Sequence, residues 1–532
     1  MVEARKKVYD LNGGYVKELK PYTKKELFDL FGLLPDEEDK LTKIIKLLRY
    51  NKRIKIHKKQ NQSDNLSDMA DEVIDVTDAI ADVSGYDYVF TCVGVIVVGG
   101  VVLKCYPKYI DKDEDKKDLL DKFKQVLRVL EKYNSRNTVI RMFSENDGEK
   151  HFNFLEVSLF LLKDYYENGT YYEQRSIIEI NGTGNVLWDR TVEQIQPILS
   201  NNRPYYTELL TKKRVDEQEN YFKRLHEYVL TECSNRFKEH DLFELFEGVT
   251  PVELSDSDFG DFGDVEYILN RLEKELGQQF NSRKQQILNS LYAYIATKKS
   301  SYNFDCLDSY STTDFELVWQ DVCAAVMDNN LHTKLRDLEP QLLLHEKYKQ
   351  SANKELIELI EKPLWESYSA ENKLEASTKA KTLEPDIISV FEHEDSKYFA
   401  ILDAKYYHVQ YSPSFKGQPG IGDITKQYLY NLAYKDFIEK HNFDHVWNCF
   451  LMPVDGSAFV KRGYAKLEIL QFFNYGNKNK DKHYKEKIDI ILLPAETMYE
   501  WYLKNIKWRK DFYEFVHLVN APEYGKVMEH NN

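Results

Sequence analysis

Positive charge is scarce in this 532-residue chain, in which 73 Lys and Arg face 88 Asp and Glu and the net charge is −15. Because non-specific affinity for DNA comes mainly from Lys and Arg that neutralise phosphates, the chain as a whole is poorly suited to hold DNA alone. No apolar run approaches the ~20 residues of a membrane helix, and the N-terminal sequence is not typical of a signal peptide. We therefore expect a cytoplasmic protein without membrane contact.

Two further kinds of site are missing from the sequence. The six cysteines form no C-x-x-C pair and have no histidines at metal-ligand spacing, which argues against a disulfide framework and against a zinc site. They are Cys92, Cys105, Cys233, Cys306, Cys323 and Cys449. There is also no G-x-x-x-x-G-K-[ST] phosphate-binding loop, so we expect the chain to hydrolyse no nucleotide by itself.

The most informative stretch of the sequence is 383–407, where two apolar runs are separated by a polar break. Residues 387–391 and 398–402 are rich in β-branched, aliphatic and aromatic side chains, which is typical of strands. The polar residues 392–397 between them indicate a hairpin turn. The sequence therefore predicts an antiparallel pair of strands at this point.

Three ionisable side chains flank the expected hairpin. Asp386 begins its first strand, while Asp403 and Lys405 are two residues apart at the end of the second and so project from one face. Two carboxylates suit Mg²⁺, which takes oxygen ligands, and an ammonium group can stabilise the charge on a phosphate under attack. The pattern favours metal-dependent phosphodiester cleavage; an ordinary edge-strand ion pair between Asp403 and Lys405 is the alternative.

Pro385-Asp386 and Asp403-Ala404-Lys405 resemble the motif of the PD-(D/E)XK nuclease superfamily. This resemblance implies a C-terminal domain with a mixed sheet flanked by helices. It also implies that Mg²⁺ is held by carboxylates and by the main-chain oxygen of Ala404.

Two helices contribute weaker matches to the same superfamily. Residues 315–322 have apolar side chains at helical spacing and place Glu316 on a helix before the hairpin, with Gln320 where a second acidic residue is expected. After the hairpin, Gln427 and Tyr430 lie one turn apart on another expected helix. The catalytic residues implied are thus Asp386, Asp403, Lys405, Glu316 and Gln427, and the implied metal ligands are Asp386, Asp403, Ala404 and Glu316.

Charge is segregated near the N-terminus. Residues 43–59 hold eight basic residues and no acid, and residues 61–85 hold seven acids and no base. A capping box at 23–26 and a basic amphipathic pattern at 41–50 predict two helices, and 53–57 alternates like a strand. Two interpretations stay open for the basic segment. It is either a winged-helix-like element whose candidate phosphate contacts are Lys46, Arg49, Lys52 and Arg53, or a docking face for an acidic partner.

The middle of the chain mixes strands and helices. Gly99-Gly100 and Asn181-Gly182 each interrupt β-rich runs, which predicts two hairpins, and Trp188 after the second is expected in the core. Helical patterns cover 114–133, 151–166 and most of 216–299.

These landmarks narrow the resemblance to one family. The runs 93–100 and 181–191, Tyr106-Pro107-Lys108 and the C-terminal motif are similar to the McrC-like endonuclease subunit of LlaJI-type restriction systems. The resemblance implies an endonuclease subunit that docks on a McrB-like AAA+ GTPase hexamer, stimulates its GTP hydrolysis and cleaves the double-stranded DNA that it translocates.

The expected architecture is a multidomain α/β protein. It has a small helical module with an acidic linker at 1–85, an α/β partner-docking domain at 86–200, a helical connector at 201–299 and the nuclease domain at 300–532. Two other functions stay open: a non-catalytic adaptor that only activates the GTPase, and a stand-alone DNA repair nuclease.

Overall fold

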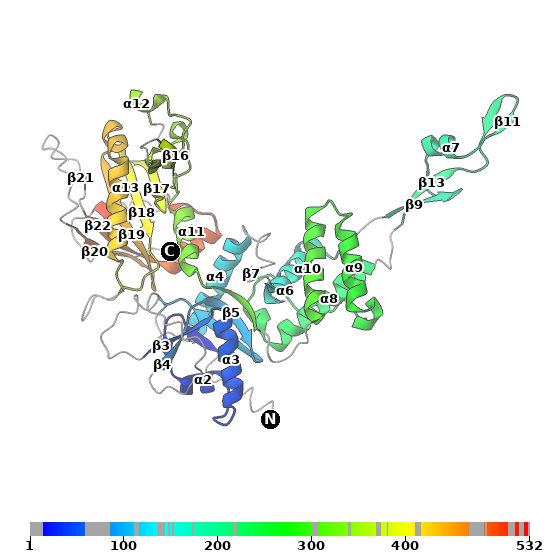
Figure 1. Cartoon of the computed structure of the whole chain (residues 1–532), viewed down its shortest axis with the longest axis horizontal. Helices are drawn as coiled ribbons and strands as arrows, with labels where there is room; N and C mark the ends of the chain where they lie inside the picture. Colours follow the sequence, from blue (N-terminus) through cyan, green and yellow to red (C-terminus); the bar gives the residue numbers. More distant parts are fainter. Residues whose placement is uncertain are drawn as a thin grey trace. The chain divides into compact units, whose positions relative to one another are not determined.

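The computed structural model describes residues 14–58, 86–110, 116–135, 144–146, 149–151, 154–172, 175–215, 221–299, 307–338, 342–368, 374–379, 381–409, 417–467, 483–484, 487–508, 517–520 and 526–529. The chain forms two compact units, one made of Met1–Thr138 with Asp305–Asn532 and the other of Val139–Phe304 (Figure 1). The first unit is therefore discontinuous in sequence, and the domain boundaries expected at 85, 200 and 299 stay a prediction. In the part of the chain that the structure describes, no helix is long and apolar enough to span a membrane.

The first unit begins with an N-terminal lobe of two small sheets and two helices. One sheet has the order β1-β6-β5-β14 and the other the order β2-β4-β3. The elements are β1 (Tyr15–Lys17), β2 (Pro21–Tyr22), α2 (Lys24–Phe31), α3 (Glu38–Tyr50), β3 (Ile54–Lys58), β4 (Tyr86–Phe90), β5 (Val93–Val98), β6 (Val101–Tyr106) and β14 (Leu307–Thr312). Strand β14, more than two hundred residues later in the chain, pairs antiparallel with β5 and so joins the C-terminal half to this lobe.

Local sequence signals account for most of the lobe. The capping box is present, with Thr23 accepting from the main chain of Glu26 and the Glu26 side chain returning to Thr23. The hairpin of β5 and β6 is confirmed, and its two turn residues, Gly99 and Gly100, have φ of 59° and 77°, a conformation that glycine adopts without a steric penalty. The lobe buries one apolar core formed by both helices and both sheets.

The rest of the first unit is built on a seven-stranded mixed sheet of order β17-β18-β19-β22-β20-β23, with β21 paired to β19. Its strands are β17 (Ile387–His393), β18 (Ser396–Ala404), β19 (His445–Val454), β20 (Ala458–Ala465), β21 (His483–Tyr484), β22 (Ile488–Pro494) and β23 (Lys526–Glu529). The central strands β18, β19 and β22 run parallel, whereas β17 and β20 are antiparallel to their neighbours. The mixed sheet expected in the C-terminal region is therefore present.

Helices and small elements surround this sheet. They are α4 (Lys116–Ser135), α11 (Phe315–Val326), η4 (Leu335–Asp337), α12 (Glu346–Lys349), η5 (Leu356–Leu359), α13 (Ile421–Lys440), α14 (Ala495–Leu503) and the exposed pair β15 (Leu364–Tyr368) and β16 (Leu374–Lys379). Tyr434 and Phe437 of α13 pack on Phe399 of β18, and Figure 1 shows α13 lying along this sheet. Trp319 of α11 donates to the carbonyl of Leu451 in β19, at 3.2 Å. Helices thus pack on the strands that carry the predicted motif.

The predicted hairpin at 387–402 is confirmed. β17 and β18 pair antiparallel from Ile387↔Leu402 to His393↔Ser396. Its turn is shorter than expected, because only Glu394 and Asp395 lie between the strands, with φ of 47° and 59°. Both residues are in the left-handed region, as a two-residue turn between twisted strands requires.

The second unit combines a helical part with short strands. Its elements are β7 (Ser144–Asn146), β8 (Glu149–His151), α6 (Phe154–Asn168), β9 (Arg175–Ile180), β10 (Asn185–Val186), α7 (Trp188–Gln194), β11 (Ile198–Ser200), β12 (Arg203–Tyr205), β13 (Leu210–Val215), α8 (Tyr221–Glu239), η2 (Leu242–Glu244), η3 (Phe259–Phe262), α9 (Val265–Leu276) and α10 (Ser282–Lys299). The helical patterns expected at 151–166 and 216–299 are confirmed as α6 and as α8 to α10.

Two expectations for residues 176–188 are wrong. Asn181-Gly182 is not the turn of a hairpin between adjacent strands, because β13 lies between β9 and β10 in the order β10-β13-β9. The main-chain N–H of Asn181, just after β9, instead donates to the carbonyl of Leu209, just before β13, at 2.8 Å. Trp188 is not a core residue, since it is 57% exposed at the start of α7.

A network of buried polar side chains holds the helices of the second unit together. Asp164 of α6 accepts two bonds from the Arg283 guanidinium of α10, at 2.8 and 2.7 Å. His226 of α8 accepts at Nδ1 from the main-chain N–H of Tyr171, at 2.9 Å, and the Tyr171 hydroxyl donates to Glu275 of α9. Burial lowers the pKa of His226 from 6.5 to about 4. His226 therefore acts as a neutral acceptor in the fold.

We expect the stability of this unit to depend on pH through His226. The unfolded chain binds a proton near pH 6.5 and the folded chain only near pH 4, so stability falls as the pH drops through this window, by about 2 kcal/mol between pH 7 and pH 5. Hydrogen exchange of α8 peptides, corrected for intrinsic rates, measures this loss. The control is His226→Gln, which keeps an acceptor that does not titrate, and an equal pH dependence in the two proteins would contradict the assignment.

Candidate active site

Three predicted side chains converge at one end of the β17–β18 pair. Asp386 directly precedes β17, Asp403 lies within β18, and Lys405 follows the end of that strand. Because Ile387 pairs with Leu402, the alternation of side chains places Asp386, Asp403 and Lys405 on the same face of the sheet. The Asp403 side chain is buried, whereas those of Asp386 and Lys405 are partly exposed.

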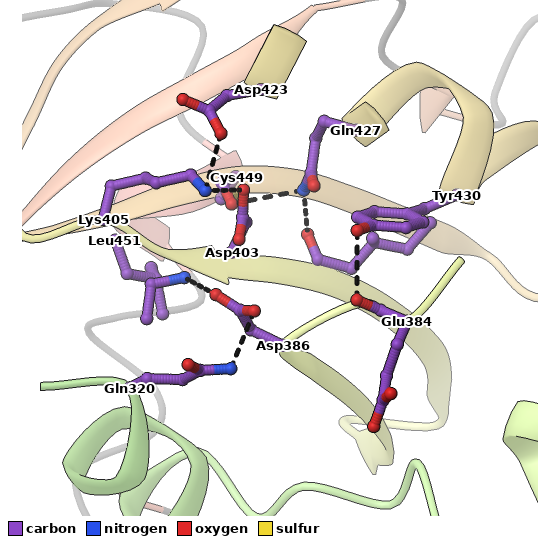
Figure 2. Close-up of polar contacts among 12 residues, drawn as sticks. Gln320, Glu384, Asp386, Asp403, Lys405, Asp423, Gln427, Tyr430, Cys449 and Leu451 are labelled. Atoms are coloured by element: carbon purple, nitrogen blue, oxygen red, sulfur yellow. Dashed lines mark hydrogen bonds and ion pairs between the residues drawn. The ribbon is translucent and has the colours of Figure 1, made fainter. Parts of the chain in front are cut away.

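Asp386 is oriented by two donors from different elements. Gln320 of α11 donates from Nε2 to Oδ1 at 2.8 Å, and the main-chain N–H of Ala404 donates to Oδ2 at 3.0 Å. Figure 2 shows Gln320 approaching Asp386 from one side, while Asp423 and Gln427 come from α13 on the other. Each oxygen of the Asp386 carboxylate therefore has a donor, and the two bonds fix the orientation of the group.

Lys405 is held between two carboxylates. Its Nζ lies 3.0 Å from Oδ2 of Asp403 and 2.9 Å from Oδ1 of Asp423, the latter in the first turn of α13. Asp423 was not singled out from the sequence, where an acid three residues after a glycine gives no distinct signal. Its ion pair with Lys405 brings the helix start into the site (Figure 2).

The charges in this site are strongly coupled. Burial and the neighbouring Asp403 together raise the pKa of Asp386 to about 8, while Lys405 acts in the opposite sense. Burial alone would lower the pKa of Lys405, but the ion pairs with Asp403 and Asp423 outweigh it, and the pKa lies above its usual value. Two adjacent carboxylates with a single ammonium beside Asp403 leave negative charge that another cation would neutralise.

Helix α13 packs on the strands of the site and hydrogen-bonds to their main chain. Gln427 is fully buried and donates from Nε2 to the carbonyls of Ile401 and Cys449, at 3.2 and 3.4 Å, which belong to β18 and β19. One turn later the Tyr430 hydroxyl donates to the carbonyl of Glu384, at 3.0 Å, just before Asp386. The pair fixes the helix to both segments that carry the carboxylates. A catalytic role for Gln427 stays a prediction.

Glu316 of α11 contacts other residues than those of the site. The charged groups that act on it are Asp314, Glu18 and Lys108, and burial raises its pKa. Among the described residues, no hydrogen bond or ion pair joins it to Asp386 or to the other residues of the site. The helix reaches the site through Gln320 instead, one turn further on, so the metal-ligand role of Glu316 stays a prediction.

The N-terminal lobe contacts the chain directly after Lys405. The Tyr406 hydroxyl donates to Oε2 of Glu18 at 2.5 Å, and the main-chain N–H of Lys108 donates to the same oxygen at 3.1 Å. Lys108 also places its Nζ 4.3 Å from the centre of the Tyr406 ring. The segment that carries the predicted catalytic lysine is thus anchored on the lobe.

The donor set fits a hard divalent cation. Asp386 and Asp403 offer carboxylate oxygens, and the main chain of Ala404 lies against Asp386. Within the described ranges, no group of three or more His, Cys, Asp and Glu side chains is arranged to hold a metal. Two carboxylates nevertheless suffice for Mg²⁺, which keeps several waters and is usually held by one or two of them.

Comparison with known proteins decides the family. Residues 92–493 match the model of the LlaJI restriction endonucleases. The chain belongs to this family. It is also 28% identical over 451 residues to the type II restriction enzyme BsuMI component YdjA of Bacillus subtilis (strain 168), which covers 82% of this chain and 86% of that protein. The resemblance to LlaJI-type restriction systems drawn from the sequence is confirmed.

Two solved structures are similar to the chain at a lower level. One is a chain of the refined half-complex from the tetradecameric assembly of Thermococcus gammatolerans McrB AAA+ hexamers with bound McrC, at 13% identity and a TM-score of 0.35, covering 92% of this chain and 99% of that one. The other belongs to the Thermococcus gammatolerans McrBC complex, at 14% identity and a TM-score of 0.26, covering 60% and 87%.

We expect Gln320→Ala to weaken DNA cleavage without unfolding the protein. The substitution removes one of the two donors that orient Asp386. A hydrogen bond to a charged group contributes about 1.5–3 kcal/mol, which corresponds to a rate loss of roughly ten- to a hundredfold. Turnover of plasmid DNA by the active restriction complex measures it, with the exposed Gln278→Ala as the matched control. Unchanged turnover in Gln320→Ala would show that the contact has no part in the reaction.

Proposed function

We propose that this restriction endonuclease cleaves double-stranded DNA in a Mg²⁺-dependent reaction at a PD-(D/E)XK centre formed by Asp386, Asp403 and Lys405. The observation that carries the proposal is the convergence of these side chains on one face at the ends of β17 and β18. The mixed sheet with a helix connecting its parallel strands β18 and β19 agrees with such a nuclease.

Each residue of the centre has a distinct task. Asp386 and Asp403 would bind the metal, with the main-chain oxygen of Ala404 as a further ligand. Mg²⁺ bound there supplies neutralisation of the scissile phosphate and an activated water. Lys405, held by Asp403 and Asp423, presents a positive charge toward the phosphate and hydrogen-bonds the attacking water. Gln320 keeps the Asp386 carboxylate in place throughout.

We further propose that the chain works as a subunit with a McrB-like AAA+ GTPase. The sequence has no phosphate-binding loop, and its net charge of −15 is unfavourable for gripping DNA alone. The Bacillus relative is named as a component of its restriction enzyme, which supports a multi-subunit assembly.

An exposed apolar surface in the second unit supports a protein partner. Seven large apolar side chains of β9, α7, β11 and β12, which follow one another closely in sequence, are 43% to 70% exposed, and apolar groups exposed together mark contact sites. They are Ile178, Ile180, Trp188, Val192, Ile198, Leu199 and Tyr205. We assign this surface to contact with the GTPase, so the second unit would contribute docking and the first unit cleavage.

Asp403→Ala should lower DNA cleavage by at least ~10³-fold, because it removes a metal-binding carboxylate. Asp403→Asn, which keeps the shape of the side chain, should lower it by a similar factor. The assay is DNA cleavage by the complex with Mg²⁺, after EDTA and after Mg²⁺ is restored. Glu392→Ala, an exposed acid of the same hairpin, is the matched control. Cleavage by either Asp403 variant within tenfold of wild type would rule out this centre.

The isolated chain should neither bind nor hydrolyse GTP and should cut DNA slowly at ~0.15 M salt, where the surface charges are screened over about 8 Å. Addition of the GTPase with GTP should switch cleavage on. The readouts are GTP turnover and DNA nicking, each with and without the partner. Rapid digestion without the partner would favour a stand-alone repair nuclease. Stimulated GTP turnover without Mg²⁺-dependent cleavage would favour a non-catalytic adaptor.

A further inference from the structure

Four lysines follow one another in sequence along α3 and the start of β3 in the N-terminal lobe, and we name Lys43, Lys46, Lys52 and Lys55 the lysine row. Helix α3 buries Leu41, Ile44, Ile45 and Leu48 against the core of the lobe. Lys43 and Lys46, one turn apart, are exposed; Lys52, after the helix, is also exposed, and Lys55 in β3 is half-buried. The row is a concentration of positive charge in a chain whose net charge is −15.

The lysine row differs from its neighbours in lacking carboxylate partners. At the start of the same helix, Lys40 pairs with Glu37 at 2.6 Å, and Lys24 pairs with Glu38 at 2.5 Å. Among the described residues, none of the four row lysines has an ion pair or side-chain hydrogen bond. Acidic side chains therefore neutralise Lys24 and Lys40, whereas the row is available to an anionic ligand.

The conformation of Lys52 is a second and independent observation. Lys52 follows the end of α3 with φ of 55°, in the left-handed region that is unfavourable for a residue with a Cβ. At the end of α2 in the same lobe, this conformation is taken by Gly32, with φ of 60°. Folding alone would be served as well or better by glycine at position 52. The backbone at position 52 therefore does not itself require a lysine.

We propose that the lysine row is a contact site for the phosphate backbone of double-stranded DNA, separate from the cleavage centre. Ammonium groups without carboxylate partners suit a polyanion such as the phosphate backbone, and such contacts hold DNA without reading its sequence. The inference rests on the proposed function in naming DNA as the ligand. The row supplies local affinity that the net charge of the chain opposes.

The first test is a double charge reversal in the full-length chain, Lys43→Glu/Lys46→Glu. Binding of a fluorescent duplex is measured by anisotropy without divalent metal, across a salt range of about 50–200 mM. The slope of log K against log salt should become shallower by about 1.8 or more, and affinity at ~0.1 M salt should fall at least about tenfold. Lys238→Glu/Lys274→Glu, two exposed lysines of the second unit, makes the same charge change and should have a much smaller effect.

The second test separates a binding role from a structural one. Lys52→Gly removes the charge and also the unfavourable left-handed conformation of a residue with a Cβ. We expect its unfolding temperature to equal or exceed that of wild type, while its affinity for DNA falls several-fold and its salt slope drops by about 0.9. Because Lys52→Gly is a separate variant, this measurement remains valid even if Lys43→Glu/Lys46→Glu destabilises the fold.

Each outcome bears on the proposal. It is overturned if the wild-type chain binds no duplex at low salt, or if the row variants bind as tightly as the control pair. Row variants that bind DNA normally but lose association with the GTPase would assign the row to an acidic protein surface instead. Loss of DNA binding in row variants, with no Mg²⁺-dependent cleavage by any form, would support the row and contradict the proposed nuclease function.

Discussion

The proposed reaction centre depends on the register of one antiparallel strand pair. Because side chains alternate along a strand, the pairing of β17 with β18 brings Asp386, Asp403 and Lys405 to one face. A slip by one residue would turn Asp403 and Lys405 away from Asp386. The register is set by a two-residue turn, in which Glu394 and Asp395 adopt left-handed conformations, and by the apolar residues that α13 covers.

The residues around this strand pair offset part of the cost of placing two carboxylates side by side. Burial and repulsion between two adjacent carboxylates both disfavour the ionised form of Asp386 and raise its pKa. Donors from Gln320 and Ala404 and the ammonium of Lys405 offset part of this repulsion. The remaining negative charge is what a divalent cation would balance. The fold thus tolerates a local cost at the place where it gains a function.

Sequence-local signals predicted the parts of the structure that depend on neighbouring residues. The capping box of α2, the glycine turn between β5 and β6 and the hairpin of the site all follow from patterns within a few residues. The site residues Asp386, Asp403 and Lys405 could be brought together for the same reason, since one hairpin carries them.

Features that depend on distant contacts could not be predicted in this way. Gln320 meets Asp386 across 66 positions, and its amide gave no signal beyond standing where an acid was expected. The expected pairing around Asn181 failed because β13, far along the chain, inserts between the two strands. Trp188 was placed in the core on residue type alone, but it begins an exposed helix. The pairing of β14 with β5, more than two hundred residues apart, likewise gave no local signal.

The central claim is that Asp386 and Asp403 together hold the catalytic cation. The most direct measurement is anomalous diffraction from crystals of the chain soaked with Mn²⁺, which occupies oxygen-ligand sites and has a distinct anomalous signal. If both carboxylates bind the cation, a peak lies between them in the wild-type protein and disappears in Asp403→Asn. A peak bound only elsewhere, or no peak here in crystals of a protein whose complex cleaves DNA, would contradict it.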